Sequence, residues 1–319
     1  MTSTVVRFGG GIRSVGELER DHVTDVSVLG TGLMGSAIAR SLLSAGRSVT
    51  VWNRTAARAL LLGSQGASVA STVTDALDAS PLAIVVVSDT NAARKVLGVL
   101  GEHSRRLDLV NLTTGSMADA EALAAFARTN DVLTLEGTVV AFPAEVGGAH
   151  ARVMFSGSQD VWERHRETLV ILGGGSEHIS SRPGAVRALN NANECFFIPA
   201  LVSMMEAAAY GKAAGVSEAL VMRSLREGIR KLAEYCDYAA PKLANDEHAT
   251  EMATIEAWLG GAARSAESMK TFGFDARLIS AAEATLEYAR DNGEGPSDIT
   301  SVYRSELSAA RARVRSAEK

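Results

Sequence analysis

The sequence predicts an α/β protein, in which an N-terminal doubly wound sheet of the Rossmann type is followed by an all-helical C-terminal half. Over 25–182, short apolar runs rich in β-branched residues alternate with helical patterns, as in a parallel sheet covered on both faces. A glycine-rich turn joins the first of these strands to the first helix. After Pro183 no strand pattern returns and helical periodicity takes over, so the fold class changes at this point.

The composition is that of a globular protein and excludes several classes of function. Of the 319 residues, 46% are hydrophobic and 22% are charged, with a net charge of -5. An acidic balance disfavours a nucleic-acid surface, so no nucleic-acid partner is expected. The two cysteines, Cys195 and Cys236, form neither a disulfide framework nor a metal-ligand cluster, so we expect no metal. They favour a reduced, cytoplasmic location.

Three domains are predicted along the chain. Residues 1–24 mix charged residues with glycine and contain no apolar core of the kind a secretory signal has, so we interpret them as an N-terminal tail. Residues 25–182 carry the alternating α/β pattern, and 183–319 carry the helical pattern.

The first strand, 26–29, leads directly into G-x-G-x-x-G at Gly30, Gly32 and Gly35. In this motif the first glycine permits a tight turn, the second lets the backbone approach a pyrophosphate, and the third lets helix and strand pack closely. Because a strand pattern precedes the motif and a helical pattern follows it, we predict dinucleotide binding.

The second strand ends in Asn53, Arg54 and Thr55. An Asp or Glu at this place would hydrogen-bond the ribose 2′-hydroxyl of NAD, and it would repel a 2′-phosphate. The guanidinium of Arg54 can pair with that phosphate, and Asn53 and Thr55 can hydrogen-bond it. The sequence therefore favours NADP(H); the alternative is a solvated arginine at a strand end.

Two later strands also end in polar residues. The apolar run 83–87 is followed by Ser88 and Asp89, and the strand 107–112 is followed by Thr113. Ligands of open α/β sheets bind at the carboxyl ends of the strands, so these side chains are candidates for the same site.

A helix predicted over 184–214 separates the two halves and contains Pro199, where we expect a kink. Its middle is apolar on nearly every face, which indicates a buried helix. Asn190, Asn191, Glu194 and Glu206 make it a poor membrane span, so no membrane partner is expected. One compact domain could hardly cover it, so we infer that a second subunit packs against it. Further helices are predicted over 218–235, 250–269, 276–292 and 297–308.

Several blocks occur together and in order, and they resemble a known family. They are Gly30–Gly35, Val51–Thr55 (V-W-N-R-T), Val110–Gly115 (V-N-L-T-T-G), Gly137–Pro143, Phe155–Ser158 (F-S-G-S) and the helical half that opens at Pro183-Gly184. Over about residues 25–315 the chain is similar to the imine reductases, which include the reductive aminases and are NADPH-dependent relatives of the β-hydroxyacid dehydrogenases.

This resemblance implies hydride transfer from NADPH to the carbon of a C=N bond. It also implies a homodimer with exchanged (domain-swapped) helical domains, so that the active site lies between one subunit's sheet domain and the other's helices. Cofactor contacts are implied for Gly30, Thr31, Gly32, Leu33, Met34 and Gly35 at the pyrophosphate, for Asn53, Arg54 and Thr55 at the 2′-phosphate, and for Ser88 and Thr113 near the ribose and nicotinamide.

The chain departs from the family at the position of the proton donor. Many imine reductases have Asp or Tyr six residues after the glycine that matches Gly184, where this chain has Asn190. A carboxamide can orient a substrate but cannot deliver a proton near neutral pH. The lysine of the hydroxyacid dehydrogenases is replaced by Arg187, which stays protonated but can clamp a carboxylate.

Arg187, Asn190, Asn191 and Glu194 follow helical spacing and share one face. We interpret them as a polar stripe lining the substrate cleft; the alternative is a solvated first turn. Tyr210 is a further candidate proton donor, with packing as the alternative. Met204, Met205 and Trp258 are candidate walls of the substrate pocket, with core packing as the alternative.

Three functions stay open on the sequence alone. The first is an imine reductase, whose iminium substrate already carries its proton. The second is a β-hydroxyacid dehydrogenase-like oxidoreductase, against which the loss of the lysine argues. The third is a non-catalytic NADP(H)-binding oligomer.

Overall fold

The computed structural model describes residues 5–8, 11–14, 24–102 and 106–317. The chain forms two compact units, Met1–Glu194 and Cys195–Lys319. Within the predicted N-terminal tail, two short strands, β1 (Val5–Phe8) and β2 (Gly11–Ser14), pair antiparallel; the rest of that tail up to residue 23 lies outside the described residues.

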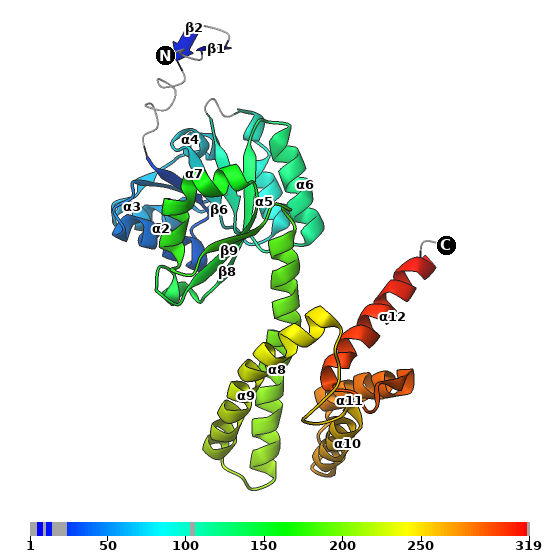
Figure 1. Cartoon of the computed structure of the whole chain (residues 1–319). Helices are drawn as coiled ribbons and strands as arrows, with labels where there is room; N and C mark the ends of the chain where they lie inside the picture. Colours follow the sequence, from blue (N-terminus) through cyan, green and yellow to red (C-terminus); the bar gives the residue numbers. More distant parts are fainter. Residues whose placement is uncertain (1–4, 9–10, 15–23, 103–105, 318–319) are drawn as a thin grey trace. The chain divides into compact units, whose positions relative to one another are not determined.

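The first unit is built on an eight-stranded sheet in the order β10-β9-β8-β7-β6-β3-β4-β5 (Figure 1). All neighbouring strands run parallel except β8 and β9. The strands are β3 (Val26–Leu29), β4 (Val49–Trp52), β5 (Ser68–Val69), β6 (Leu82–Val85), β7 (Asp108–Asn111), β8 (Leu133–Val140), β9 (Arg152–Gly157) and β10 (Glu177–Ser180). The predicted doubly wound sheet is confirmed.

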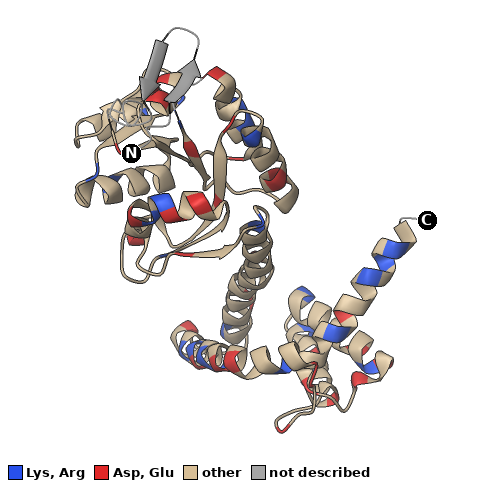
Figure 2. Cartoon of the chain, turned by 45° about the horizontal axis from the view of Figure 1, so that its top comes forward, with Lys and Arg blue, Asp and Glu red and all other residues tan. Residues whose placement is uncertain are grey.

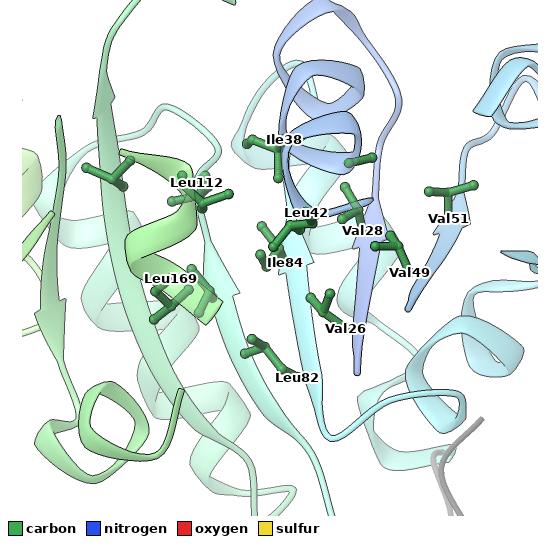
Figure 3. Packing of buried hydrophobic residues seen from close by; sticks show 14 of the residues in the cluster. Val26, Val28, Ile38, Leu42, Val49, Val51, Leu82, Ile84, Leu112 and Leu169 are labelled. Carbon is green, nitrogen blue, oxygen red and sulfur yellow. The ribbon is translucent and has the colours of Figure 1, made fainter. Parts of the chain in front are cut away.

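Helices cover both faces of this sheet. Successive strand residues point to opposite faces, and because apolar side chains lie on both, each face needs a layer of helices to bury them. Val28 and Ile84 pack with Ile38, Leu42 and Leu169 on one face, which Figure 3 shows from close by. Leu29 and Val85 belong to the cluster on the other face, which α4, α5 and α6 complete. The helices of this unit are α2 (Leu33–Ser44), α3 (Ala56–Gly63), α4 (Val73–Asp78), α5 (Thr90–Leu97), α6 (Met117–Arg128) and α7 (Gln159–Leu169), with short turns η2 (Leu100–Glu102), η3 (Pro143–Glu145) and η4 (Val170–Leu172).

The second unit is helical, as predicted. Its helices are the C-terminal part of α8 (Ala185–Ala213), then α9 (Glu218–Asn245), α10 (Ile255–Thr271), α11 (Arg277–Ala289) and α12 (Val302–Ala317), with short turns η5 (Arg290–Glu294) and η6 (Ile299–Ser301). α8 is a single helix that continues through Pro199; the predicted kink stays a prediction. Its first turns belong to the first unit, so the division into units falls inside α8, whereas the predicted domain boundary lies at 182/183.

Three features of the fold differ from the sequence-based expectations. β5 has two residues and β10 pairs only at an edge of the sheet, so neither has the buried apolar run by which the other strands are recognised. α9 contains Pro241 and extends to Asn245, which is ten residues beyond the predicted end at Tyr235 (245 − 235).

Among the described residues, no helix is both long and apolar enough to cross a membrane.

Candidate cofactor and active site

The glycine turn has the geometry that the motif predicts. Gly30 follows β3 with φ of +103°, and a Cβ placed on it would lie 2.0 Å from the Val86 carbonyl oxygen. A Cβ on Gly35 would lie 1.9 Å from the carbonyl oxygen of Gly30. By contrast, a Cβ on Gly32 would meet nothing within 4 Å. Gly30 and Gly35 therefore let strand and helix approach each other, and Gly32 borders open space at the N-terminus of α2.

Thr31 is fixed by its backbone and has a free hydroxyl. Its amide donates to Asn53 Oδ1 at 3.0 Å, and Asn53 Nδ2 donates to the carbonyl of Thr55 at 3.0 Å. Asn53 thus ties the glycine turn to the end of β4. Thr31 is only 3% exposed, yet its Oγ1 has no hydrogen-bond partner among the described residues.

The end of β4 presents two exposed arginines. Arg54 and Arg58 are exposed, and no ion pair is recorded for either in the described part of the chain. Arg58 lies in the first turn of α3, one helical turn after Arg54, and the sequence analysis missed it. Its signal was the spacing R-x-x-x-R directly after the strand.

Ser88 and Asp89 form a local cap rather than a free pair. Ser88 Oγ donates to Asp89 Oδ2 at 2.7 Å, and Asp89 Oδ1 accepts from the amide of Ala92 at 2.9 Å. The hydrogen bond from Ser88, followed by that from the Ala92 amide, lowers the pKa of Asp89. Asp89 therefore stays ionised as the N-cap of α5.

Thr113 is held in place from two sides. Its amide donates to Asn111 Oδ1 at 3.0 Å, and its Oγ1 accepts from the amide of Val87 at 3.1 Å. Val87 closely follows the end of β6 and Thr113 closely follows the end of β7, so this contact links two neighbouring strand ends.

Arg187 lies in a buried ion pair that the sequence did not reveal. Its Nε and Nη2 donate to Glu136 Oε2 at 3.0 and 2.5 Å, and Nη2 also donates to the carbonyl of Asn111 at 3.0 Å. Arg187 is 2% exposed and Glu136 is fully buried. Burial raises the pKa of Glu136, while the Arg187 guanidinium and the Asn111 amide act in the opposite direction. Because Glu136 lies 51 residues before its partner, no local pattern predicts the pair.

The other residues of the predicted polar stripe are less enclosed. Asn190 is half-buried, whereas Asn191 and Glu194 are exposed, and no hydrogen bond of these three side chains is recorded among the described residues. The start of their helix is fixed by Ser156, whose Oγ donates to the carbonyl of Pro183 at 2.7 Å and accepts from the amide of Val186 at 3.1 Å. Their predicted roles stay predictions.

The remaining candidates belong to the second unit. Tyr210 Oη and Ser268 Oγ are joined by a hydrogen bond of 2.7 Å, and the Tyr210 ring packs edge-on against Phe272. It lines a groove of about 530 Å³ together with Glu206 and Arg264. Met205 and Trp258 are about half exposed, and Met204 is partly buried. Among the described residues, no group of His, Cys, Asp or Glu has the arrangement of a metal site.

The fold and the glycine turn are those of a dinucleotide-binding protein. Residues 25–180 match the NAD binding domain of 6-phosphogluconate dehydrogenase, and 183–306 match the C-terminal domain of the NADPH-dependent reductive aminase-like proteins. The two matches follow each other along the chain, the first over the sheet and the second over the helical half. The chain belongs to the imine reductase and reductive aminase family.

Relatives and solved structures agree with this assignment. The chain is 24% identical over 280 residues to an NADPH-dependent reductive aminase of Aspergillus oryzae, a match that covers 87% of this chain and 95% of the relative. An imine reductase from Pseudomonas sp. superposes with a TM-score of 0.83 at 28% identity, covering 89% of this chain and 99% of that one. An imine reductase from Myxococcus stipitatus in complex with NADP+ gives 0.82 at 27% identity, covering 88% and 99%.

Proposed function

We propose that this protein is an NADPH-dependent imine reductase, which transfers a hydride to the carbon of a C=N bond. The proposal depends on one combination: a glycine turn of the dinucleotide-binding type lies beside a strand end that has no carboxylate and is followed by Arg54 and Arg58. Neither arginine has an ion pair recorded among the described residues. The family's reductive aminases and imine reductases use the same cofactor class. A cytoplasmic location is proposed with it, on the strength of two unpaired cysteines.

The residues present fit NADPH. The open side of Gly32 and the first backbone amides of α2, which have no acceptor within the helix itself, suit a pyrophosphate. The hydroxyl of Thr31, which has no hydrogen-bond partner among the described residues, lies in the same turn. Arg54 and Arg58 would hold the 2′-phosphate. Asn53 contributes by fixing the turn, because both polar atoms of its side chain already bond to backbone.

When bound, NADPH supplies the hydride from its nicotinamide ring. The residues of this chain orient and enclose the substrate and the cofactor, and they do not transfer a proton to the substrate. Thr113, held by Asn111 and Val87, presents a fixed strand end. Asn190 would position the substrate nitrogen; since an iminium ion already carries its proton, no side-chain acid is required. Preorganised placement is then the main source of rate.

The ion pair argues against the hydroxyacid dehydrogenase alternative. That reaction needs a group that accepts the alcohol proton, and Arg187 occupies the position of the lysine. Its guanidinium is held by Glu136 in the interior, where it neither loses a proton nor is free to clamp a substrate carboxylate with both nitrogens. The imine reductase is therefore the better supported oxidoreductase.

We also propose a homodimer with exchanged helical domains. In the second unit Phe196, Phe197 and Ile198 of α8 are 45–59% exposed, and α9 has no buried residue. Figure 2 shows that α8 carries few charged residues along its length. Apolar patches of this extent usually mark protein interfaces, and a second copy of the chain is the proposed cover.

The activity is tested with purified protein, NADPH and a cyclic imine such as methylpyrroline, following the loss of the nicotinamide absorbance. We expect the imine to cause oxidation of NADPH and little oxidation of NADH. Oxidation of a hydroxyacid with NADP+ and no imine reduction would replace the proposal by the dehydrogenase. Tight NADPH binding without turnover on any imine or carbonyl compound would identify a non-catalytic binder.

The phosphate contacts are tested by Arg54→Ala combined with Arg58→Ala. Each charge-assisted hydrogen bond to phosphate contributes about 1.5–3 kcal/mol, so we expect NADPH affinity to fall at least about tenfold while NADH affinity stays the same. Arg40→Ala, an exposed arginine on α2, is the matched control. Equal losses for both cofactors would show that these arginines do not recognise the 2′-phosphate.

A further inference from the structure

A cavity of about 380 Å³ lies in the first unit between α5 and α6, which are neighbours in Figure 1. Of the residues predicted to contact the cofactor, Thr113 alone is among those that line it. Ligand pockets commonly have volumes of about 300–1,000 Å³. The cavity is therefore large enough for a small molecule and is distinct from the glycine turn.

Its walls are apolar. Ala93 and Leu97 contribute from α5, and Leu123 and Phe126 contribute from α6. Ala93 and Leu97 are buried, whereas Phe126 is 42% exposed. Such walls favour the hydrocarbon part of a ligand.

Its polar floor contains a nitrogen for which the described residues offer no hydrogen-bond acceptor. Arg187, Glu136 and Asn111 all line the cavity. Glu136 and Asn111 take up Nε and Nη2 of Arg187, and the amide group of Asn111 is itself bonded to Glu136 and Thr113. For Arg187 Nη1 no acceptor is recorded in the described part of the chain, although the residue is 2% exposed. Arg187 Nη1 is not among the fully enclosed side-chain atoms that lack a partner in the described residues, so it stays accessible and can donate a hydrogen bond to a molecule in the cavity that Arg187 lines.

The charges around the cavity cancel in pairs. Arg187 pairs with Glu136 in the floor, and Arg94 pairs with Asp119 at 2.9 Å. These two cations and two anions leave no net charge among the lining residues. An ionic ligand would find no counter-ion here, whereas a neutral ligand with one acceptor oxygen matches both the walls and Nη1.

We propose that this cavity is a binding site for a small neutral molecule with an apolar body and a carbonyl oxygen, which accepts a hydrogen bond from Arg187 Nη1. The proposal goes beyond the imine reductase activity and does not depend on it. Because Asn111 and Thr113 are bonded to each other, the site also adjoins the strand end that the reaction uses.

The test compares three probes of one shape: benzamide, benzoate and benzamidinium, which are neutral, anionic and cationic. Binding to the full-length protein is followed by NMR on isotope-labelled samples, without cofactor or imine. We expect saturable binding of benzamide, with shifts at residues of α5 and α6, and affinities at least about tenfold weaker for both ions. Equal or tighter binding of either ion, or no saturable binding of benzamide, would overturn the proposal.

Two variants locate the bound probe. Leu123→Trp fills the cavity from α6 and should abolish benzamide binding while NADPH binding persists; Leu61→Trp on the exposed surface of α3 is its matched control. Arg187→Lys keeps the charge but removes Nη1, and it should lower the affinity for benzamide by about tenfold. Benzamide binding that survives Leu123→Trp would place the probe elsewhere and contradict the assignment.

Discussion

The two compact units of the chain bury their apolar residues to very different extents. In the first, side chains such as Val28, Leu29 and Ile84 are fully buried on both faces of the sheet. In the second, the buried cluster is limited to a few residues of α10 and α11, and α9 contributes none. The first unit buries its own apolar residues, whereas the second leaves many of its apolar residues exposed, where the proposed second subunit would pack. Stability should therefore depend on interior contacts in one unit and on association in the other.

The largest effect should come from separating the ion pair of the first unit. Glu136→Leu leaves the Arg187 guanidinium buried without its counter-ion, and breaking such a pair costs about 3–5 kcal/mol. The free energy of unfolding from urea titration should fall by this amount. The double variant Glu136→Leu with Arg187→Met should recover most of the loss, since a well-packed apolar pair is often neutral. A single variant as stable as the double would contradict the pairing.

The glycine turn should separate a folding effect from a binding effect. Gly30→Ala places a Cβ against the Val86 carbonyl at positive φ, so overpacking and strain together should lower the unfolding free energy by about 2–4 kcal/mol. Gly32→Ala meets no atom within 4 Å and should change it by no more than about 0.5 kcal/mol. NADPH affinity should nevertheless fall in Gly32→Ala, as calorimetric titration can measure. Similar stability losses in both variants would contradict this division.

A buried carboxylate should make the second unit sensitive to acid. Burial by itself raises the pKa of Asp298, but hydrogen bonds, led by that from Tyr235 Oη at 2.6 Å, outweigh it and lower the pKa to about 2. Since the folded-state pKa lies below the usual value of 3.8, the stabilisation is present above about pH 4 and is lost as pH falls towards 2.

This contribution amounts to about 2 kcal/mol. Hydrogen exchange of α10 amides at decreasing pH should report it, and Asp298→Asn should remove the dependence. Asp275→Asn, at an exposed carboxylate, is the control and should leave the pH profile unchanged. A profile that Asp298→Asn does not alter would rule out this group as its source.

The smallest change in the isolated chain should come from the apolar surface of α9. Ile229 is 52% exposed, so Ile229→Lys should alter the unfolding free energy of a monomer by no more than about 0.5 kcal/mol. It should instead shift the protein from dimer to monomer in sedimentation experiments. Arg226→Lys, on the same helix, should keep the dimer. A dimer that tolerates Ile229→Lys would remove this surface from the proposed interface.

The fold was predictable where the signal is local, and the site was predictable only in part. The glycine turn and the apolar strands 26–29 and 82–85 can be recognised from neighbouring residues, because turn geometry and burial on both faces leave local patterns. Glu136 could not be predicted, since one acid inside a strand has no spacing that names its partner on α8. Arg58 could have been predicted as a second arginine near Arg54, because the two are separated by only three residues of sequence. Asp89 also left a signal, because Asp before a helical run is typical of an N-cap.

The Glu136–Arg187 pair has a consequence for how related chains can diverge. Losing either member alone strands a charge in the protein interior, whereas exchanging both together for apolar residues does not. The two positions are therefore expected to covary during evolution, passing from ionic to hydrophobic as a unit. Related chains that keep the glutamate at position 136 should also keep the arginine at position 187, even where the surface residues of the protein have changed.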